Sequence, residues 1–131
     1  MTRTQGGWTL IELLVVMSLI AVLSTLALVQ YRNSIQASKE AVLKADLFHM
    51  RDAIDQYYAD KGSYPASIQA LVTDGYLRRV PTDPITRSAD SWVTVAAEAD
   101  PNSPSASPGI YDVKSAADGI ALDGTRYADW H

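Results

Sequence analysis

The 131-residue chain contains no cysteine and only two histidines. Without cysteine there is no disulfide, no thiolate nucleophile and no Cys-ligated zinc. The histidines, His49 and His131, stand far apart in the sequence. The chain also lacks a glycine-rich phosphate loop and a nucleophile motif. The sequence therefore indicates a protein that is not an enzyme.

The chain also lacks a surplus of positive charge. It has 11 Lys and Arg residues against 15 Asp and Glu residues, a net charge of −4. Binding to nucleic-acid phosphates requires an excess of Lys and Arg on some face. The only basic cluster is Arg78-Arg79, with Arg87 nearby. We therefore predict no nucleic-acid partner.

Proline and glycine are absent between Trp8 and Lys61, and residues 13–29 carry no charge. With residues 8–11 added, the apolar run reaches roughly 20 residues, which suffices to span a bilayer. The sequence predicts one helix over residues 8–61. Its first part, 8–30, is the membrane-spanning segment, and its second part, 31–61, is amphipathic.

The amphipathic part has apolar residues at helical spacing, namely Leu43, Leu47, Met50, Ile54 and Tyr57/Tyr58. This stripe predicts a face that packs on a globular head. The opposite-charge pairs Glu40–Lys44 and Arg51–Asp55 have the i,i+4 spacing of surface pairs. We expect both pairs on the outer side of the helix.

Residues 1–7 form a short polar leader that carries Arg3. Positive charge favours the cytoplasmic side of a membrane, so the acidic body is expected on the other side. An ordinary secretory signal, cleaved near residues 24–27, is the alternative. Glu12 at the start of the run, and the length of the run, weigh against it.

Glu12 has two interpretations. An acid at the edge of an apolar helix is costly when unpaired, which suggests a partner. Thr9 and Glu12 also fit a capping box, in which the acid only satisfies N–H groups at the helix start. The residues alone leave both interpretations open.

Residues 62–131 are predicted to form a small head. Gly62 ends the long helix, residues 66–73 read as a short helix, and residues 92–97 and 109–114 alternate as strands that pair antiparallel. Residues 98–108 read as an exposed loop. The predicted fold class is α+β, with the long N-terminal helix packed on this head.

Three acids near the C-terminus, Asp118, Asp123 and Asp129, stand among glycines. Carboxylates on an irregular loop suit Ca²⁺, which takes six to eight oxygen ligands. Asp-Gly is also a common turn dipeptide, so two ordinary turns are the alternative. The spacing is not that of an EF-hand.

Residues 6–16, GGWTLIELLVV, resemble the type IV prepilin signature. The resemblance implies cleavage after Gly7 by a prepilin peptidase and N-methylation of the new first residue, Trp8. It also implies that Glu12 pairs with the terminal amine of a neighbouring subunit during assembly. Trp8 departs from the usual phenylalanine. The domains implied are leader 1–7, helix 8–61 and head 62–131.

The segments GSYPASIQALV and DGYLRRVPTDP, followed by a Trp-led strand, resemble the major pseudopilin of type II secretion systems. This implies a homopolymeric periplasmic pseudopilus that starts from the inner membrane, with an assembly platform protein and minor pseudopilins as partners. It also implies structural calcium in the C-terminal loop, with Asp118 matching well and Asp123 as the better second ligand. The alternatives are a surface type IV pilus subunit and a single-span anchored module that never polymerises.

Overall fold

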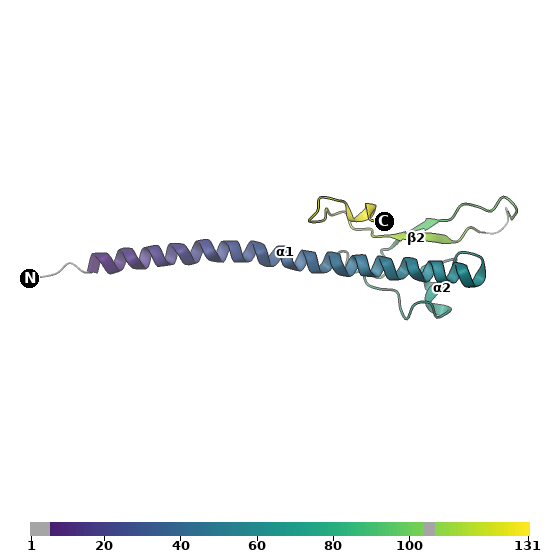
Figure 1. Cartoon of the computed structure of the whole chain (residues 1–131), viewed down its shortest axis with the longest axis horizontal. Coiled ribbons are helices and arrows are strands. Elements are labelled where there is room, and N and C mark those ends of the chain that lie inside the picture. Colours follow the sequence, from purple (N-terminus) through teal and green to yellow (C-terminus); the bar gives the residue numbers. More distant parts are fainter. Residues whose placement is uncertain (1–5, 104–106) are drawn as a thin grey trace, which may run out of the picture. The chain divides into compact units, whose positions relative to one another are not determined.

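The structure is a computed structural model that describes residues 6–103 and 107–131. Its elements, in chain order, are helix α1 (Gly6–Lys61), helix α2 (Ile68–Thr73), strand β1 (Val93–Ala96), strand β2 (Ile110–Lys114) and a 3₁₀ turn, η1 (Tyr127–Asp129) (Figure 1). This confirms the predicted α+β class. The chain forms two compact units, one ending at Gln36 and the other beginning at Ala37, so the boundary falls inside α1.

The first part of α1 has an exposed apolar surface. Within the described chain, α1 is the one helix long and apolar enough to cross a membrane, with a mean hydropathy of 2.5 over its best window and none of that window buried. Two hydroxyls in this part bond to the helix itself: Ser18 Oγ donates to the Leu14 carbonyl (2.8 Å) and Thr25 Oγ1 to the Ala21 carbonyl (2.9 Å). Such back-bonding lets Ser and Thr sit in apolar surroundings without an unsatisfied donor.

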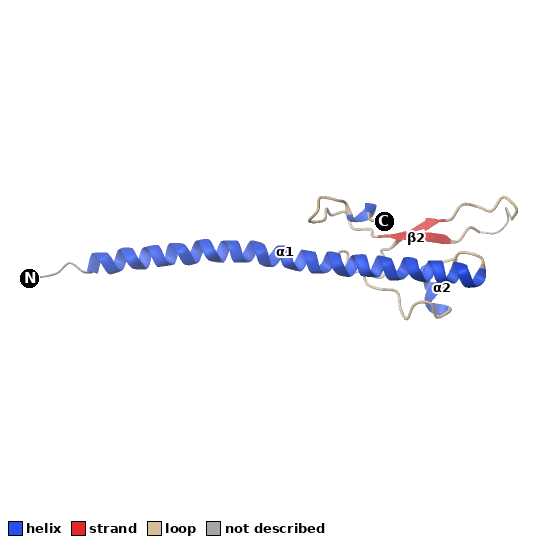
Figure 2. Ribbon diagram, viewed as in Figure 1, coloured by secondary structure: helices blue, strands red, loops and turns tan. Residues whose placement is uncertain are grey.

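The second part of α1 supplies the core of the head. Leu43, Leu47, Met50 and Ile54 are buried, which confirms the predicted stripe. They form one core with Leu71 of α2 and Val113 of β2, so this part of α1 packs against both elements (Figure 2). At the end of the stripe, Tyr57 packs against the core, whereas Tyr58 is exposed and stacks on Tyr64 with ring centroids 4.5 Å apart.

α1 ends as predicted at Lys61, because Gly62 adopts φ +69 and its N–H donates to the Tyr58 carbonyl (2.8 Å). This left-handed conformation favours glycine. The predicted short helix is α2, which begins two residues later than expected. Ser67 caps it by accepting the Ala70 N–H (3.2 Å).

β1 and β2 pair antiparallel, with Val93 opposite Lys114 and a bulge between Val95 and Ala96. This confirms the predicted pairing. Gly109 precedes β2 at a point where the backbone lies against Tyr64: a Cβ at Gly109 would lie 2.5 Å from the Tyr64 carbonyl oxygen. The Ile110 N–H donates to the Pro65 carbonyl (2.8 Å), which fixes the start of β2 to the turn after α1.

The expectation for Glu40 and Arg51 is wrong. Glu40 is buried, and Arg51 forms an ion pair with Asp112 of β2 (2.7 Å) rather than lying on the outer side of α1. Both side chains face the head because partners far along the chain satisfy their charges there. Helical spacing alone does not reveal such partners.

Candidate functional site

The predicted processing and assembly residues lie at the start of α1. Gly7, Trp8 and Glu12 are all helical and exposed, and Trp8 is 72% exposed. Glu12 is the only charged residue between Trp8 and Tyr31. The structure thus places one negative charge on an otherwise uncharged helix surface. The leader residues 1–5, including Arg3, lie outside the described residues.

The capping-box interpretation of Glu12 does not hold in this chain. α1 begins at Gly6, three residues before Thr9. The Thr9 hydroxyl donates to the Gly6 carbonyl (3.1 Å), whereas an N-cap hydroxyl accepts a helix N–H. Pairing of Glu12 with the terminal amine of a neighbouring subunit stays a prediction from the resemblance.

The C-terminal segment 115–131 folds back on the second part of α1. Asp123 and Gly124 form a turn: Gly124 has φ +86, and its N–H donates to the Ala121 carbonyl (3.0 Å). An isolated bridge pairs Ile120 with Arg126 on either side of this turn. The segment therefore contains an ordinary Asp-Gly turn at Asp123, as one of the two alternatives predicted.

The Asp123 carboxylate is bonded within this turn. Its Oδ1 accepts both the N–H (2.9 Å) and the hydroxyl (2.5 Å) of Thr125. The hydroxyl bond, and then the N–H bond, hold the pKa of Asp123 below its usual value. Asp123 therefore stays ionised as the cap of its own turn.

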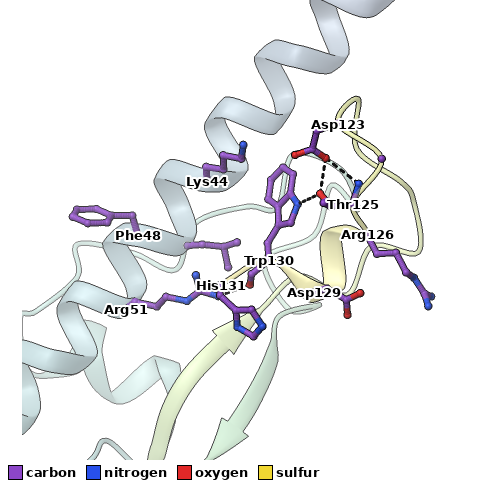
Figure 3. Close-up of a pocket in the computed structure, with 11 residues that line it drawn as sticks. Lys44, Phe48, Arg51, Asp123, Thr125, Arg126, Asp129, Trp130 and His131 are labelled. Carbon is purple, nitrogen blue, oxygen red and sulfur yellow. Dashed lines mark hydrogen bonds between the residues drawn. The ribbon is translucent and has the colours of Figure 1, made fainter.

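The three acids predicted to bind calcium do not come together. Asp118 is exposed and precedes Gly119, whose Cα faces the Tyr127 ring. Asp129 lies in η1, and its carboxylate points away from Asp123 (Figure 3). Across residues 6–103 and 107–131, no three His, Asp or Glu side chains are placed to share a metal ion. The arrangement shown does not fit a calcium ion held by all three acids.

Sequence reasoning missed the polar residues that hold the head together. Asp83 is fully buried, and its Oδ2 accepts the Ser115 hydroxyl (2.5 Å) while its Oδ1 accepts the Ile85 N–H (2.8 Å). This carboxylate joins the proline-flanked segment to the start of the C-terminal loop. The sequence does show that Asp83 lies between Pro81 and Pro84, which marks it as part of a rigid segment. That position does not identify Ser115 as its hydrogen-bond partner.

A pocket of about 800 Å³ opens between α1 and the C-terminal segment (Figure 3). Lys44, Phe48 and Arg51 line it from the helix, and Trp130 lines it from the C-terminal side. The lining contains both positive and negative side chains, so the pocket does not select a ligand of one charge. None of its features supplies a nucleophile with an adjacent base.

Residues 2–28 match the family model of the prokaryotic N-terminal methylation motif. The chain is 33% identical to type II secretion system core protein G of Pseudomonas aeruginosa, over 63% of this chain and 69% of that protein. It is 27% identical to the protein of the same name from Escherichia coli, over 63% and 68%. It is also 32% identical to fimbrial protein EcpC of Eikenella corrodens, over 60% of this chain and 54% of that protein.

No solved structure matches the chain. Family membership therefore rests on the methylation motif, the identity along the chain and the α+β fold described above. These agree with the two resemblances found in the sequence. The chain belongs to the prepilin-type family of type II secretion system core protein G, the major pseudopilins.

Proposed function

We propose that this protein is a structural subunit that polymerises through the first part of α1 into a periplasmic pseudopilus for type II secretion. The observation that carries the proposal is the exposed apolar surface of residues 8–31, on which Glu12 is the one charged residue. Such a surface needs lipid or other apolar helices around it. A single-span anchor explains the apolar surface but leaves Glu12 without a role.

Different interactions stabilise the two stages of this function, which are insertion into the membrane and transfer from lipid into the filament. Burying one large apolar side chain away from water is worth about 1.5–3 kcal/mol, so the segment is stable in a membrane. Lipid tails are as apolar as leucine, so moving from lipid into a filament depends on close packing and polar pairing. Glu12 supplies the polar pairing, because an unpaired carboxylate in an apolar setting is costly.

The processing steps complete the proposal. Cleavage after Gly7 creates a new amine at Trp8, which is then methylated and stays positively charged. That amine lies one turn of helix from Glu12, so pairing with a neighbouring copy sets the relative position of the two helices. Gly7 lies in the first turn of α1, which has to fray for a peptidase to reach its carbonyl.

The remaining partners and the location follow from the same proposal. The subunit is held in the inner membrane with the leader in the cytoplasm and the head in the periplasm. A prepilin peptidase, an assembly platform protein and minor pseudopilins act on it there. The role is structural throughout, as it is for the family, and no catalytic step is assigned to any residue.

The test compares Glu12→Gln with Glu98→Gln, which removes the same charge from an exposed position in the head. Both proteins are produced with the secretion machinery, and sheared filaments and membrane fractions are quantified. Glu12→Gln is expected to lower the filament yield at least about tenfold, the loss expected for about 1.4 kcal/mol per contact, while membrane insertion persists. Filament yields that match for the two variants would remove the role proposed for Glu12.

A surface type IV pilus subunit is the second candidate, favoured by the similarity to fimbrial protein EcpC. The two candidates differ in where the filament lies. Immunogold labelling of the head in intact cells detects a surface pilus, whereas a periplasmic pseudopilus is labelled only after the outer membrane is opened.

Calcium binding by the C-terminal loop stays a prediction from the resemblance. Asp118 is exposed and available, whereas Asp123 would have to give up its bonds to Thr125. If the ion binds, its role is structural: it would restrain the C-terminal loop. By this resemblance, EDTA lowers the melting temperature of the head. The alternative argued below, in which the segment stays folded without the ion, predicts an unchanged melting temperature.

A further inference from the structure

The C-terminal segment contacts α1 through three polar residues of the helix. Glu40, Lys44 and Arg51 are spaced four and seven residues apart, close to whole turns, so they lie along one face of the helix. Glu40 meets Leu122 and Tyr127, whereas Lys44 and Arg51 both meet Trp130. These contacts span 79 to 87 residues of sequence.

Glu40 makes the most buried of these contacts. Only 9% of it is exposed, and its Oε1 accepts the Leu122 N–H (2.9 Å) and the Tyr127 hydroxyl (2.8 Å). Leu122 precedes the Asp123 turn and Tyr127 follows it. One carboxylate oxygen thus holds both ends of the turn, and bonds to an ionised acceptor are the strong ones.

Lys44 and Arg51 hold the end of the chain. The Lys44 ammonium lies 4.7 Å from the centre of the Trp130 ring, and the Trp130 Nε1–H donates to the Thr125 hydroxyl (2.7 Å), which caps Asp123 (Figure 3). Arg51 Nη2 donates to the Trp130 carbonyl (2.8 Å) and the Val113 carbonyl (3.0 Å). The Lys44 ammonium over the ring and the Arg51 guanidinium at the backbone carbonyl therefore hold Trp130 at two points.

We propose that Glu40, Lys44 and Arg51 form a clasp that keeps the C-terminal segment folded on α1 without a divalent cation. Lys44 places positive charge beside the Asp123 turn, and Glu40 links the two ends of that turn. The three acids of the loop do not converge, and Asp123 is committed to Thr125. The proposal concerns the single subunit, so it stands apart from the polymerisation proposed above.

The test measures the unfolding of the full-length protein in detergent, followed by near-UV circular dichroism, in excess EDTA and in millimolar CaCl₂. The expected melting temperature is the same in both. Glu40→Gln is expected to lower it by at least about 5 °C in both solutions, since about 1 kcal/mol shifts a head of this size by that much. The matched control is Asp55→Asn, an acid of the same helix that is exposed.

A second variant keeps the test informative if Glu40→Gln does not fold. Tyr127→Phe removes one hydroxyl and leaves the ring in the core. Hydrogen exchange is expected to rise in peptides covering residues 115–131 and to stay unchanged in β1. The proposal is overturned if CaCl₂ raises the melting temperature of the wild-type protein above its value in EDTA. It is also overturned if both clasp variants melt and exchange like the Asp55→Asn control.

Discussion

The two parts of α1 share one helix yet differ in what surrounds them. Before Gln36 the side chains are exposed, the hydroxyls bond to their own helix, and Glu12 is the only charge up to Tyr31. After Ala37 the helix buries Leu43, Leu47, Met50 and Ile54 and uses Glu40 and Arg51 to hold distant segments. The second part buries its apolar face within the chain's own head. The first part leaves its apolar surface exposed, and in the proposed function lipid or other copies of the helix cover it. Mutations in the two parts should therefore change different measurements.

The largest expected effect comes from Leu47→Ala. Leu47 is 2% exposed in the core of the head, so its truncation leaves a cavity and is expected to cost about 3 kcal/mol of unfolding free energy. The matched change is Leu23→Ala in the first part, where leucine is 63% exposed. Leu23→Ala is expected to leave the melting of the head unchanged and to weaken filaments. If both substitutions lowered the stability of the head equally, the two parts of α1 would not differ in their contribution to the head.

An intermediate effect is expected from Asp83→Ala. The substitution removes the acceptor for the buried Ser115 hydroxyl and the Ile85 N–H, and unsatisfied buried donors are expected to cost about 2–3 kcal/mol. Chemical denaturation monitored by Trp92 fluorescence measures the loss, because the Trp92 indole is held nearby by the Pro81 carbonyl. Asp90→Ala, at an exposed position, is the control. Equal midpoints for the two variants would show that the Asp83 contacts add no stability.

The smallest effect concerns pH. Partial burial raises the pKa of Asp46 above the ordinary value of 3.8; the nearby His49 opposes this shift, and Asp83 adds to it. A raised carboxyl pKa contributes stability below pH 3.8 that is lost as the pH rises through the folded-state pKa. Asp46→Asn cannot ionise, so its melting temperature relative to wild type is expected to increase across that window. A constant difference from acid to neutral pH would show that Asp46 does not titrate differently on folding.

The sequence was most informative where the signals were local. The absence of glycine and proline from residue 8 to residue 61 predicted α1 almost to its ends, and Gly62 marked its last turn. Period-two alternation located β1 and β2. The prepilin signature identified the family through a few residues at fixed spacing. All of these signals come from neighbours within a few positions.

The parts that the sequence did not reveal are long-range polar contacts. Glu40 and Arg51 have i,i+4 partners of opposite charge, and the local rule assigned them to the surface. Their observed partners lie 61 to 87 residues away, at β2 and in the C-terminal segment. A single sequence contains no local mark of such pairs. The buried contact of Asp83 was missed for the same reason, because its partner Ser115 is 32 residues away.

The back-bonded hydroxyls of Ser18 and Thr25 have one further consequence. Because both hydroxyl protons are used within the helix, Ser18 and Thr25 donate no hydrogen bond to a neighbouring helix. In the proposed filament, these two positions would therefore not fix the rotation of one helix against the next. Such a filament is expected to twist and stretch under mechanical load at little energetic cost.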